Sequence, residues 1–205
     1  MSDLGQLSPA TQDYLKAIWS LGEWDESGVT MTALAGRLQV RTSTASDGVR
    51  KLVEQGFVEH APYGAITLTE SGAAHAVGMV RRHRLLETFL AIELGYGWHE
   101  VHEEAESLEH AVSDDFIDRI DARLGHPTRD PHGDPIPPAT VPPYAVTLAT
   151  FPPGTVGIVV RVSDSSPERL QRFAAAGILP DAVVTTTSPL ALDAEDAAAI
   201  WVIPQ

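Results

Sequence analysis

Two histidines and two glutamates recur at helical spacing in the segment 102–110, which reads HEEAESLEH. If this segment is a helix, His102, Glu106, Glu109 and His110 lie on one face, because side chains at i, i+4, i+7 and i+8 share a stripe. Imidazoles and carboxylates cost free energy when they are buried without partners, so this stripe would make a poor core. The same groups can ligate a divalent cation. The alternative interpretation is a solvated acidic helix face.

Further groups with ligand chemistry stand earlier in the chain. His83 and Glu87 are four residues apart in a long predicted helix, 73–94, a spacing that suits two ligands of one cation and also an ordinary surface hydrogen bond. Asp13 lies near the start of a predicted helix over 11–22. An acidic residue there also interacts favourably with the positive end of a helix, so its type alone does not decide its role.

The composition limits the kind of metal site. The 205 residues include no cysteine, which excludes disulfides, thiolate nucleophiles and cysteine-ligated zinc or iron–sulfur centres. Any metal must therefore be held by histidine, carboxylate, carbonyl or water. A hydrophobic content of 43% is sufficient for ordinary cores. Because no apolar run is long enough to cross a bilayer and no signal peptide is recognisable, we expect a soluble, cytoplasmic protein with no membrane partner.

The charge is strongly acidic but uneven. A formal net charge of −14 argues, for the whole chain, against nucleic acid as a partner. The acids are concentrated in 99–121, where Arg119 is the single Lys or Arg. In 31–68, Lys and Arg slightly outnumber the acids. The acidity therefore lies away from the segment in which a DNA-binding pattern occurs.

That pattern is a predicted winged helix-turn-helix. A short helix over 30–38, a turn at 40–42 and a second helix over 43–55 give two helices joined by a tight turn. Two short alternating segments, 57–60 and 65–69, flank a Pro/Gly turn and predict a β-hairpin. This combination commonly places its second helix in the DNA major groove.

The predicted DNA-contacting face is small and polar near the start of the second helix, with a basic pair behind. Short hydroxyl side chains let a helix N-terminus approach phosphates and base edges. The alternative is an ordinary exposed helix face. The predicted DNA-binding residues are Arg41, Thr42, Ser43, Thr44, Ser46, Asp47, Arg50, Lys51 and, in the turn of the hairpin, Tyr63.

The rest of the chain predicts helices, a proline-rich strap and a small β domain. After a break at 95–97, helices are expected over 99–113 and 114–124. Prolines exclude a regular helix in 125–143, where Asp130, His132 and Asp134 add three possible ligands. From 144 onward, strands are expected at 145–148, 156–162, 182–187 and 199–203, with a helix at 167–176.

With these elements the whole chain resembles the metal-dependent repressors related to the diphtheria toxin repressor, and most closely their manganese-sensing branch. The resemblance rests on Asp13-Tyr14-Leu15, the winged helix, RRHRLLE at 81–87, HEEAESLEH at 102–110 and DPHGDPIP at 130–137. It implies a fold that is mainly α with small β parts. The implied domains are a DNA-binding domain (1–72), a helical metal-binding and dimerisation domain with a proline-rich linker (73–143) and a FeoA-like small β-barrel (144–205).

The resemblance also implies two metal sites. An activating site would use Asp13, Glu106, Glu109 and His110. An ancillary site would use His83, Glu87 and His102, completed by groups from the linker or the barrel. Asp164 is the nearest candidate in the barrel, and His132 and Asp130 are the candidates in the linker.

The predicted function is a manganese-activated repressor of metal-homeostasis genes that binds operator DNA as a homodimer. Carboxylates at Asp13 and Glu106, where the iron-sensing branch typically has Met and Cys, make the site harder and favour Mn²⁺, although Fe²⁺, Co²⁺ and Zn²⁺ also bind oxygen-rich sites. The alternatives are an iron-dependent repressor of the same family and a binuclear metal-dependent hydrolase. A hydrolase would commonly carry Glu-x-x-His on two helices; Glu106, Glu109 and His110 resemble half of that arrangement, and the second copy is missing. We therefore expect no enzyme activity.

Overall fold

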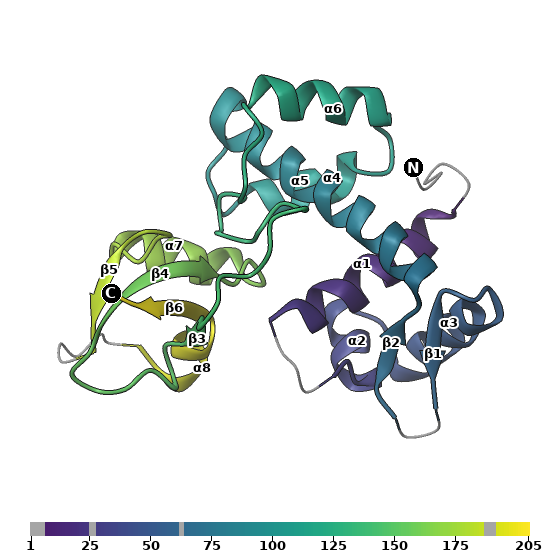
Figure 1. Ribbon diagram of the computed structural model, residues 1–205, viewed down its shortest axis with the longest axis horizontal. Helices are drawn as coiled ribbons and strands as arrows, with labels where there is room; N and C mark the ends of the chain where they lie inside the picture. The colour runs from purple at the N-terminus through teal and green to yellow at the C-terminus, as the bar shows by residue number, and fades with distance from the viewer. Residues whose placement is uncertain (1–6, 25–27, 62–63, 187–191) are drawn as a thin grey trace. The chain divides into compact units, whose positions relative to one another are not determined.

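The computed structural model of the protein describes residues 7–24, 28–61, 64–186 and 192–205. The chain forms two compact units, Met1–Arg82 and His83–Gln205, and the long helix α4 (Glu70–Leu94) contributes to both. Figure 1 labels the helices and strands of each unit. The expected fold class, mainly α with small β parts, is confirmed.

Three helices build the core of the first unit. Their bounds are α1 (Pro9–Glu23), α2 (Met31–Arg37) and α3 (Thr42–Glu54). Ser8 and Thr30 act as N-caps, each accepting a hydrogen bond from a backbone N–H three residues later, which satisfies a group that the helix leaves unpaired. Apolar residues at helical spacing then face inward, so α1, α2 and α3 share one hydrophobic cluster around Leu15, Leu34 and Val49.

A two-stranded hairpin completes the predicted winged helix-turn-helix. Strands β1 (Val58–His60) and β2 (Ile66–Leu68) pair antiparallel, with Val58 opposite Leu68. Val58 and Ile66 are buried in the same cluster as the helices. The turn contains Tyr63, which lies outside the described residues.

The second unit begins with the C-terminal half of α4, against which α5 (Val101–Leu108) and α6 (Asp114–Arg123) pack through Leu86, Ala105 and Ile120. The prediction of one helix over 99–113 is wrong at its C-terminal end. The α-helix stops at Leu108, and the chain turns through 109–112 so that Ser113 can cap α6 by accepting a hydrogen bond from the Phe116 N–H.

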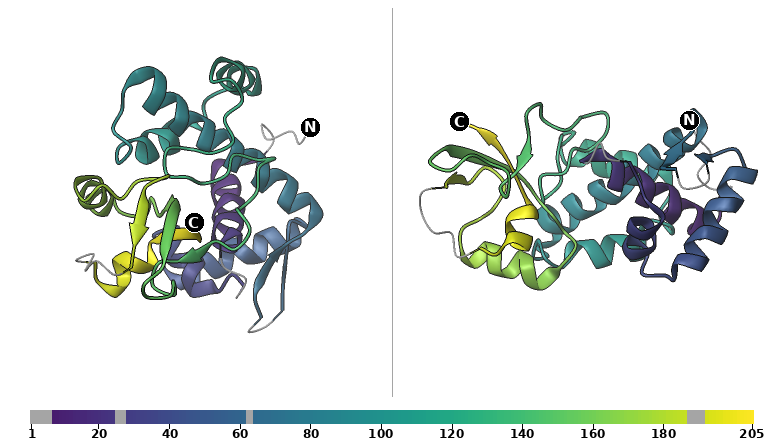
Figure 2. Two further views of the ribbon diagram at one scale, coloured as in Figure 1. Left: turned by 60° about the vertical axis from the view of Figure 1, so that its left-hand side comes forward. Right: turned by 90° about the horizontal axis from the view of Figure 1, so that it is seen from below.

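The C-terminal part contains a four-stranded antiparallel sheet of order β3-β6-β4-β5. The strands are β3 (Val146–Thr147), β4 (Val156–Val162), β5 (Val183–Thr185) and β6 (Ile200–Pro204). Leu170 and Phe173 of helix α7 (Pro167–Ala175) are buried in one hydrophobic cluster with residues of the sheet. Figure 2 shows the ribbon from two further directions. A short helix, α8 (Ala194–Ala198), was not predicted; Asp193 caps it by accepting a hydrogen bond from the Asp196 N–H.

The proline-rich segment 125–143 contains no helix, as predicted, and part of it follows β4 closely. The Val162 N–H donates to the His132 carbonyl oxygen at 2.9 Å. Gly133 has a φ of +93°, and a Cβ there would lie 2.0 Å from the Val160 carbonyl oxygen, so only glycine fits. These contacts hold this part of the proline-rich strap against β4. No helix of the described residues is long and apolar enough to span a membrane.

Candidate metal centre and nucleic-acid interface

Four side chains with metal-ligating atoms converge in the second unit. His83 and Glu87 lie on α4, His102 on α5, and Asp164 two residues beyond the end of β4. One ligand atom from each lies within 4.8 Å of the others. We call this group the ancillary cluster. It contains three residues predicted as ligands and the barrel residue that was the nearest candidate to complete them.

The contacts within the ancillary cluster are short. His83 Nε2 lies 3.0 Å from Glu87 Oε1 and 3.1 Å from His102 Nδ1. His102 Nδ1 also lies 2.9 Å from Asp164 Oδ2. Two imidazole nitrogens and two carboxylate oxygens thus point at one another from three elements, an arrangement that a divalent cation would hold together through four bonds.

The charges of this cluster are strongly coupled. Burial alone would lower the pKa of His102, but the carboxylates of Asp164 and Glu87 outweigh it and raise that pKa to about 10. Burial alone would raise the pKa of Glu87, yet the neighbouring His83 and His102 hold it well below its usual value. A protonated imidazole therefore sits where a cation would fit.

Glu87 also faces a second group, formed with Asp130 and His132 of the strap, and all three are buried. His132 is 0% exposed, and its Nε2–H donates to the Trp98 carbonyl oxygen at 2.6 Å. This hydrogen bond fixes the tautomer, so Nδ1 carries the lone pair. Among the described residues Nδ1 has no hydrogen-bond partner, and it lies 3.9 Å from Glu87 Oε2. A buried, oriented lone pair beside two carboxylates is a metal-ligand arrangement.

Asp130 is held in place by the backbone of the strap. Its Oδ1 accepts hydrogen bonds from the N–H groups of His132 and Asp134 at 2.8 and 3.0 Å. Burial, together with the nearby charges of Asp134 and Glu87, raises the pKa of Asp130 well above its usual value. A bound cation would oppose this rise, because a nearby positive charge favours the ionised carboxylate.

Glu109 joins the predicted activating residues to the ancillary cluster. It is 0% exposed, and its Oε2 lies 2.7 Å from His83 Nδ1. Glu106, His83 and Glu109 form a further group of ligand atoms within 4.8 Å of one another. His110 Nε2 lies 3.6 Å from Glu109 Oε1, from the turn that follows α5.

Asp13, the fourth predicted activating ligand, lies on α1 in the first unit. Because α1 begins at Pro9, two residues earlier than predicted, Asp13 is not in the first turn of the helix. This weakens the alternative that it serves only to interact with the positive helix end. Its participation in metal binding stays a prediction.

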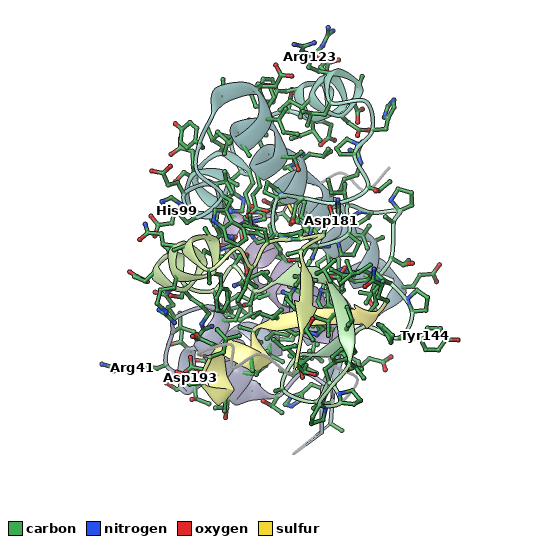
Figure 3. The ribbon with its side chains drawn as sticks, turned by 90° about the vertical axis from the view of Figure 1, so that its left-hand side faces the viewer. Arg41, His99, Arg123, Tyr144, Asp181 and Asp193 are labelled. Carbon is green, nitrogen blue, oxygen red and sulfur yellow. The ribbon has the colours of Figure 1, made fainter. Side chains whose placement is uncertain are left out.

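The predicted DNA-contacting face lies on α3. Ala45, Val49 and Leu52 are buried, which leaves the opposite face in solvent. Arg41 is the N-cap and makes no capping hydrogen bond with its side chain, and Figure 3 shows that side chain extending outward. The other exposed residues of this face are Thr42, Ser43, Thr44, Ser46, Asp47, Arg50 and Lys51. Arg50 Nη2 donates to Asp47 Oδ1 at 2.9 Å, so these two charges act as a pair.

Sequence reasoning did not single out Arg84, which lies beside the metal clusters. Arg84 Nη1 donates to the Pro135 carbonyl oxygen at 2.5 Å, and its Nε lies 3.8 Å from Asp130. Asp134, a possible ligand in the sequence analysis, instead accepts a hydrogen bond from Arg161 Nε at 2.6 Å. The place of Arg84 between His83 and Glu87 in the same predicted helix was the available signal.

Comparison with known proteins agrees with this architecture. Residues 6–66 match the N-terminal DNA-binding domain of the iron-dependent repressors, and residues 69–138 match their metal-binding and dimerisation domain. Residues 146–204 match the FeoA domain.

Individual relatives cover most of the chain. The iron-dependent repressor IdeR of Mycobacterium tuberculosis (strain ATCC 25618 / H37Rv) is 33% identical over 91% of this chain and 87% of its own length. The diphtheria toxin repressor of Corynebacterium diphtheriae is 34% identical over 64% of this chain and 58% of its own length.

Comparison with solved structures also finds metal-dependent regulators. A manganese-dependent transcriptional repressor in complex with manganese is 49% identical, with a TM-score of 0.86 and coverage of 95% of this chain and 100% of that one. The manganese regulator SloR is 28% identical, with a TM-score of 0.80 over 97% of this chain and 100% of that one. The chain belongs to the family of metal-dependent transcriptional repressors that includes IdeR and the diphtheria toxin repressor.

Proposed function

We propose that the protein is a manganese-activated transcriptional repressor that binds operator DNA as a homodimer and controls genes of metal-ion homeostasis. The observation that carries the proposal is the convergence of His83, Glu87, His102 and Asp164 in a chain that also contains a winged helix-turn-helix. A hydrolase or a simple metal buffer would leave the exposed polar face of α3 without a role.

Manganese is the proposed metal because the ligand set is hard. The predicted ligands are carboxylates and imidazoles, with no sulfur from a chain that lacks cysteine. Oxygen-rich sites suit Mn²⁺, whereas thiolate and thioether ligands favour softer ions. The 49% identical structure named as a manganese-dependent repressor supports the same choice. Fe²⁺, Co²⁺ and Zn²⁺ are the competing ions, and iron-dependent IdeR is the relative that represents the alternative.

The proposed activating site combines Asp13 with Glu106, Glu109 and His110, and the proposed ancillary site combines the ancillary cluster with Asp130 and His132. A bound cation supplies positive charge that cancels the repulsion among these carboxylates. Asp13 would then hold α1, and with it α3, in the position that fits DNA. Two α3 helices of a dimer must match half-sites about 34 Å apart, or a multiple of that, so a small change in their placement changes affinity.

We propose different kinds of DNA contact for different residues of α3. Arg41 and Lys51 would contact phosphates, and the hydroxyls of Thr42, Ser43 and Thr44 would approach phosphate and base edges. Tyr63 would contact the backbone from the wing. Ile92, Leu94 and Phe116 are exposed apolar residues of the helical domain and suit the proposed dimer contact. A repressor of this kind acts where the chromosome is, so the proposed location is the cytoplasm.

The decisive experiment titrates Mn²⁺, Fe²⁺, Zn²⁺ and Co²⁺ into a DNA-binding assay with the DNA upstream of the protein's own gene. We expect Mn²⁺ to raise DNA affinity by at least about fivefold, the lower end of ordinary allosteric coupling. Equal activation by all four ions would overturn the manganese assignment and keep the repressor. DNA affinity that no ion changes would overturn both.

Enzyme activity is not part of this proposal. Glu106, Glu109 and His110 resemble one half of the arrangement that binuclear hydrolases use, but the described residues contain no Glu-x-x-His sequence. We therefore expect no Mn²⁺-dependent turnover of generic phosphoesters or esters, and measurable turnover would contradict the assignment.

Metal binding at the ancillary cluster should release a proton. Because the pKa of His102 is about 10, this imidazole is protonated at neutral pH and must lose its proton to become a ligand. The Mn²⁺ affinity of this cluster should therefore rise with pH toward about 10 and fall as the pH is lowered. Calorimetric titrations at pH 7.5 in two buffers of different ionisation enthalpy measure the release, and His102→Gln should abolish it. A buffer-independent heat in the unsubstituted protein would contradict this prediction.

A further inference from the structure

The Tyr14 side chain joins α1 to the DNA-contacting helix by a polar contact. The Tyr14 hydroxyl donates a hydrogen bond to the Thr44 carbonyl oxygen at 3.1 Å. Tyr14 follows Asp13 directly in the chain, and Thr44 lies among the exposed hydroxyl residues at the start of α3. The contact thus connects the neighbour of a proposed metal ligand with the proposed DNA-binding face.

Gly48 shows that this contact is closely fitted. A Cβ at Gly48 would lie 2.4 Å from Tyr14 ring atoms and 2.6 Å from the hydroxyl oxygen. Glycine within a helix costs about 1 kcal/mol relative to alanine. Gly48 has no positive φ that would require glycine, so the approach of the Tyr14 ring is its structural reason. The ring fills the space that a side chain at 48 would occupy.

We propose that Tyr14 is a positioning residue that transmits the placement of α1 to the recognition helix α3. This inference rests on the proposed function, in which Asp13 ligates the activating cation. Consecutive residues of a helix point about 100° apart, so Asp13 and Tyr14 face different directions from the same turn. The hydroxyl fixes how far α3 can slide or rotate against α1, and the ring alone would leave that register looser.

The test compares Tyr14→Phe with the unsubstituted protein in DNA binding with and without saturating Mn²⁺. Phenylalanine keeps the ring and removes only the hydroxyl. We expect the ratio of metal-bound to metal-free DNA affinity to fall about two- to tenfold, the range of one net hydrogen bond. Mn²⁺ affinity measured without DNA should be unchanged. Because coupling between two ligands is reciprocal, the increase in Mn²⁺ affinity caused by DNA should fall by the same factor.

Tyr144→Phe is the matched control. It makes the same chemical change at a residue that is 85% exposed and extends outward in Figure 3, and its affinity ratio should match that of the unsubstituted protein. Gly48→Ala gives an independent second variant, because its Cβ must displace the Tyr14 ring. We expect the affinity ratio of Gly48→Ala to fall as well, with its far-UV circular dichroism unchanged.

Two outcomes would overturn the role of Tyr14. The affinity ratio of Tyr14→Phe could equal that of the unsubstituted protein, and if DNA affinity has then fallen equally with and without Mn²⁺, Tyr14 is a plain structural or DNA-contacting residue. Mn²⁺ affinity without DNA could fall, which would place the effect in the metal site. If the unsubstituted protein shows no metal dependence, the proposed function itself fails, and this result is distinguishable from the other two.

Discussion

Replacing Glu106 by alanine should abolish Mn²⁺-dependent operator binding while leaving the fold intact. The Glu106 side chain is 39% exposed, so its removal leaves little buried space and no orphaned core group. As a proposed ligand of the activating cation, however, it supplies a negative charge that no neighbour replaces. Changing even an outer partner of a metal ligand typically costs about 10- to 100-fold in affinity, so losing a ligand itself should cost about 100-fold or more.

Glu103→Ala is the control for this substitution. Glu103 lies on the same helix, is exposed, and belongs to none of the groups of converging ligand atoms. It removes the same charge and the same atoms, so any general effect of acidity near DNA should appear equally in both variants. Calorimetry gives the Mn²⁺ affinity, and fluorescence anisotropy of labelled operator DNA gives the DNA affinity at saturating and zero metal.

Asp13→Ala, a substitution in the first unit of the chain, should also abolish Mn²⁺-dependent operator binding. If Asp13 and Glu106 ligate one cation, the double substitution should lose little more than either single substitution, because each already removes the site. Losses that simply add would show that the two carboxylates act independently. Operator binding that keeps its metal dependence in both single variants would exclude the proposed activating site.

Much of the winged helix could be predicted from the sequence because local chemistry determines it. Ser8 and Thr30 are side-chain caps at the positions where apolar periodicity begins, and Gly56 supplies the positive φ of 78° that ends the α3 segment. The spacing of His83 and Glu87 likewise places both on one face of α4, and both are buried there. These features depend on residues a few positions apart.

The remainder depends on contacts between distant segments, which one sequence does not display. Asp164 contacts His102 across 62 positions of the chain, because the fold of the second unit brings the residues after β4 to the start of α5. Helix α5 ends at Leu108, and the chain then turns before Ser113 caps α6. The apolar periodicity of 99–113 does not reveal this end. Asp130 and His132 looked like alternatives to Asp164, whereas the structure places all three around Glu87, in two groups that share this carboxylate.

Arg84→Met should destabilise the second unit by about 3–5 kcal/mol in the absence of metal, the usual cost of breaking a buried ion pair from one side. Arg84 is 5% exposed and donates to the Pro135 carbonyl oxygen, while its Nη2 lies 3.5 Å from Asp134. Methionine fills much of the same volume but removes the positive charge of the guanidinium from beside the carboxylates of Asp130 and Asp134. Burial, Asp134 and Glu87 raise the pKa of Asp130 and Arg84 opposes this rise, so removing the guanidinium should raise that pKa further.

Urea unfolding of the metal-free protein, followed by a signal from the second unit, measures the effect of Arg84→Met. Arg123→Met is the control, because its ion pair with Glu93 is 3.0 Å long but 69% exposed on the arginine side, and exposed pairs contribute at most about 1 kcal/mol. Saturating Mn²⁺ should restore part of the stability of Arg84→Met, since a cation at Glu87, Asp130 and His132 would supply the charge that the arginine no longer provides.

Equal stability of the two variants would mean that Arg161 alone neutralises Asp134. A deficit that Mn²⁺ does not reduce would mean that Arg84 acts by holding the strap at Pro135 rather than by its charge. The two results together therefore separate the mechanical role of this arginine from its electrostatic one.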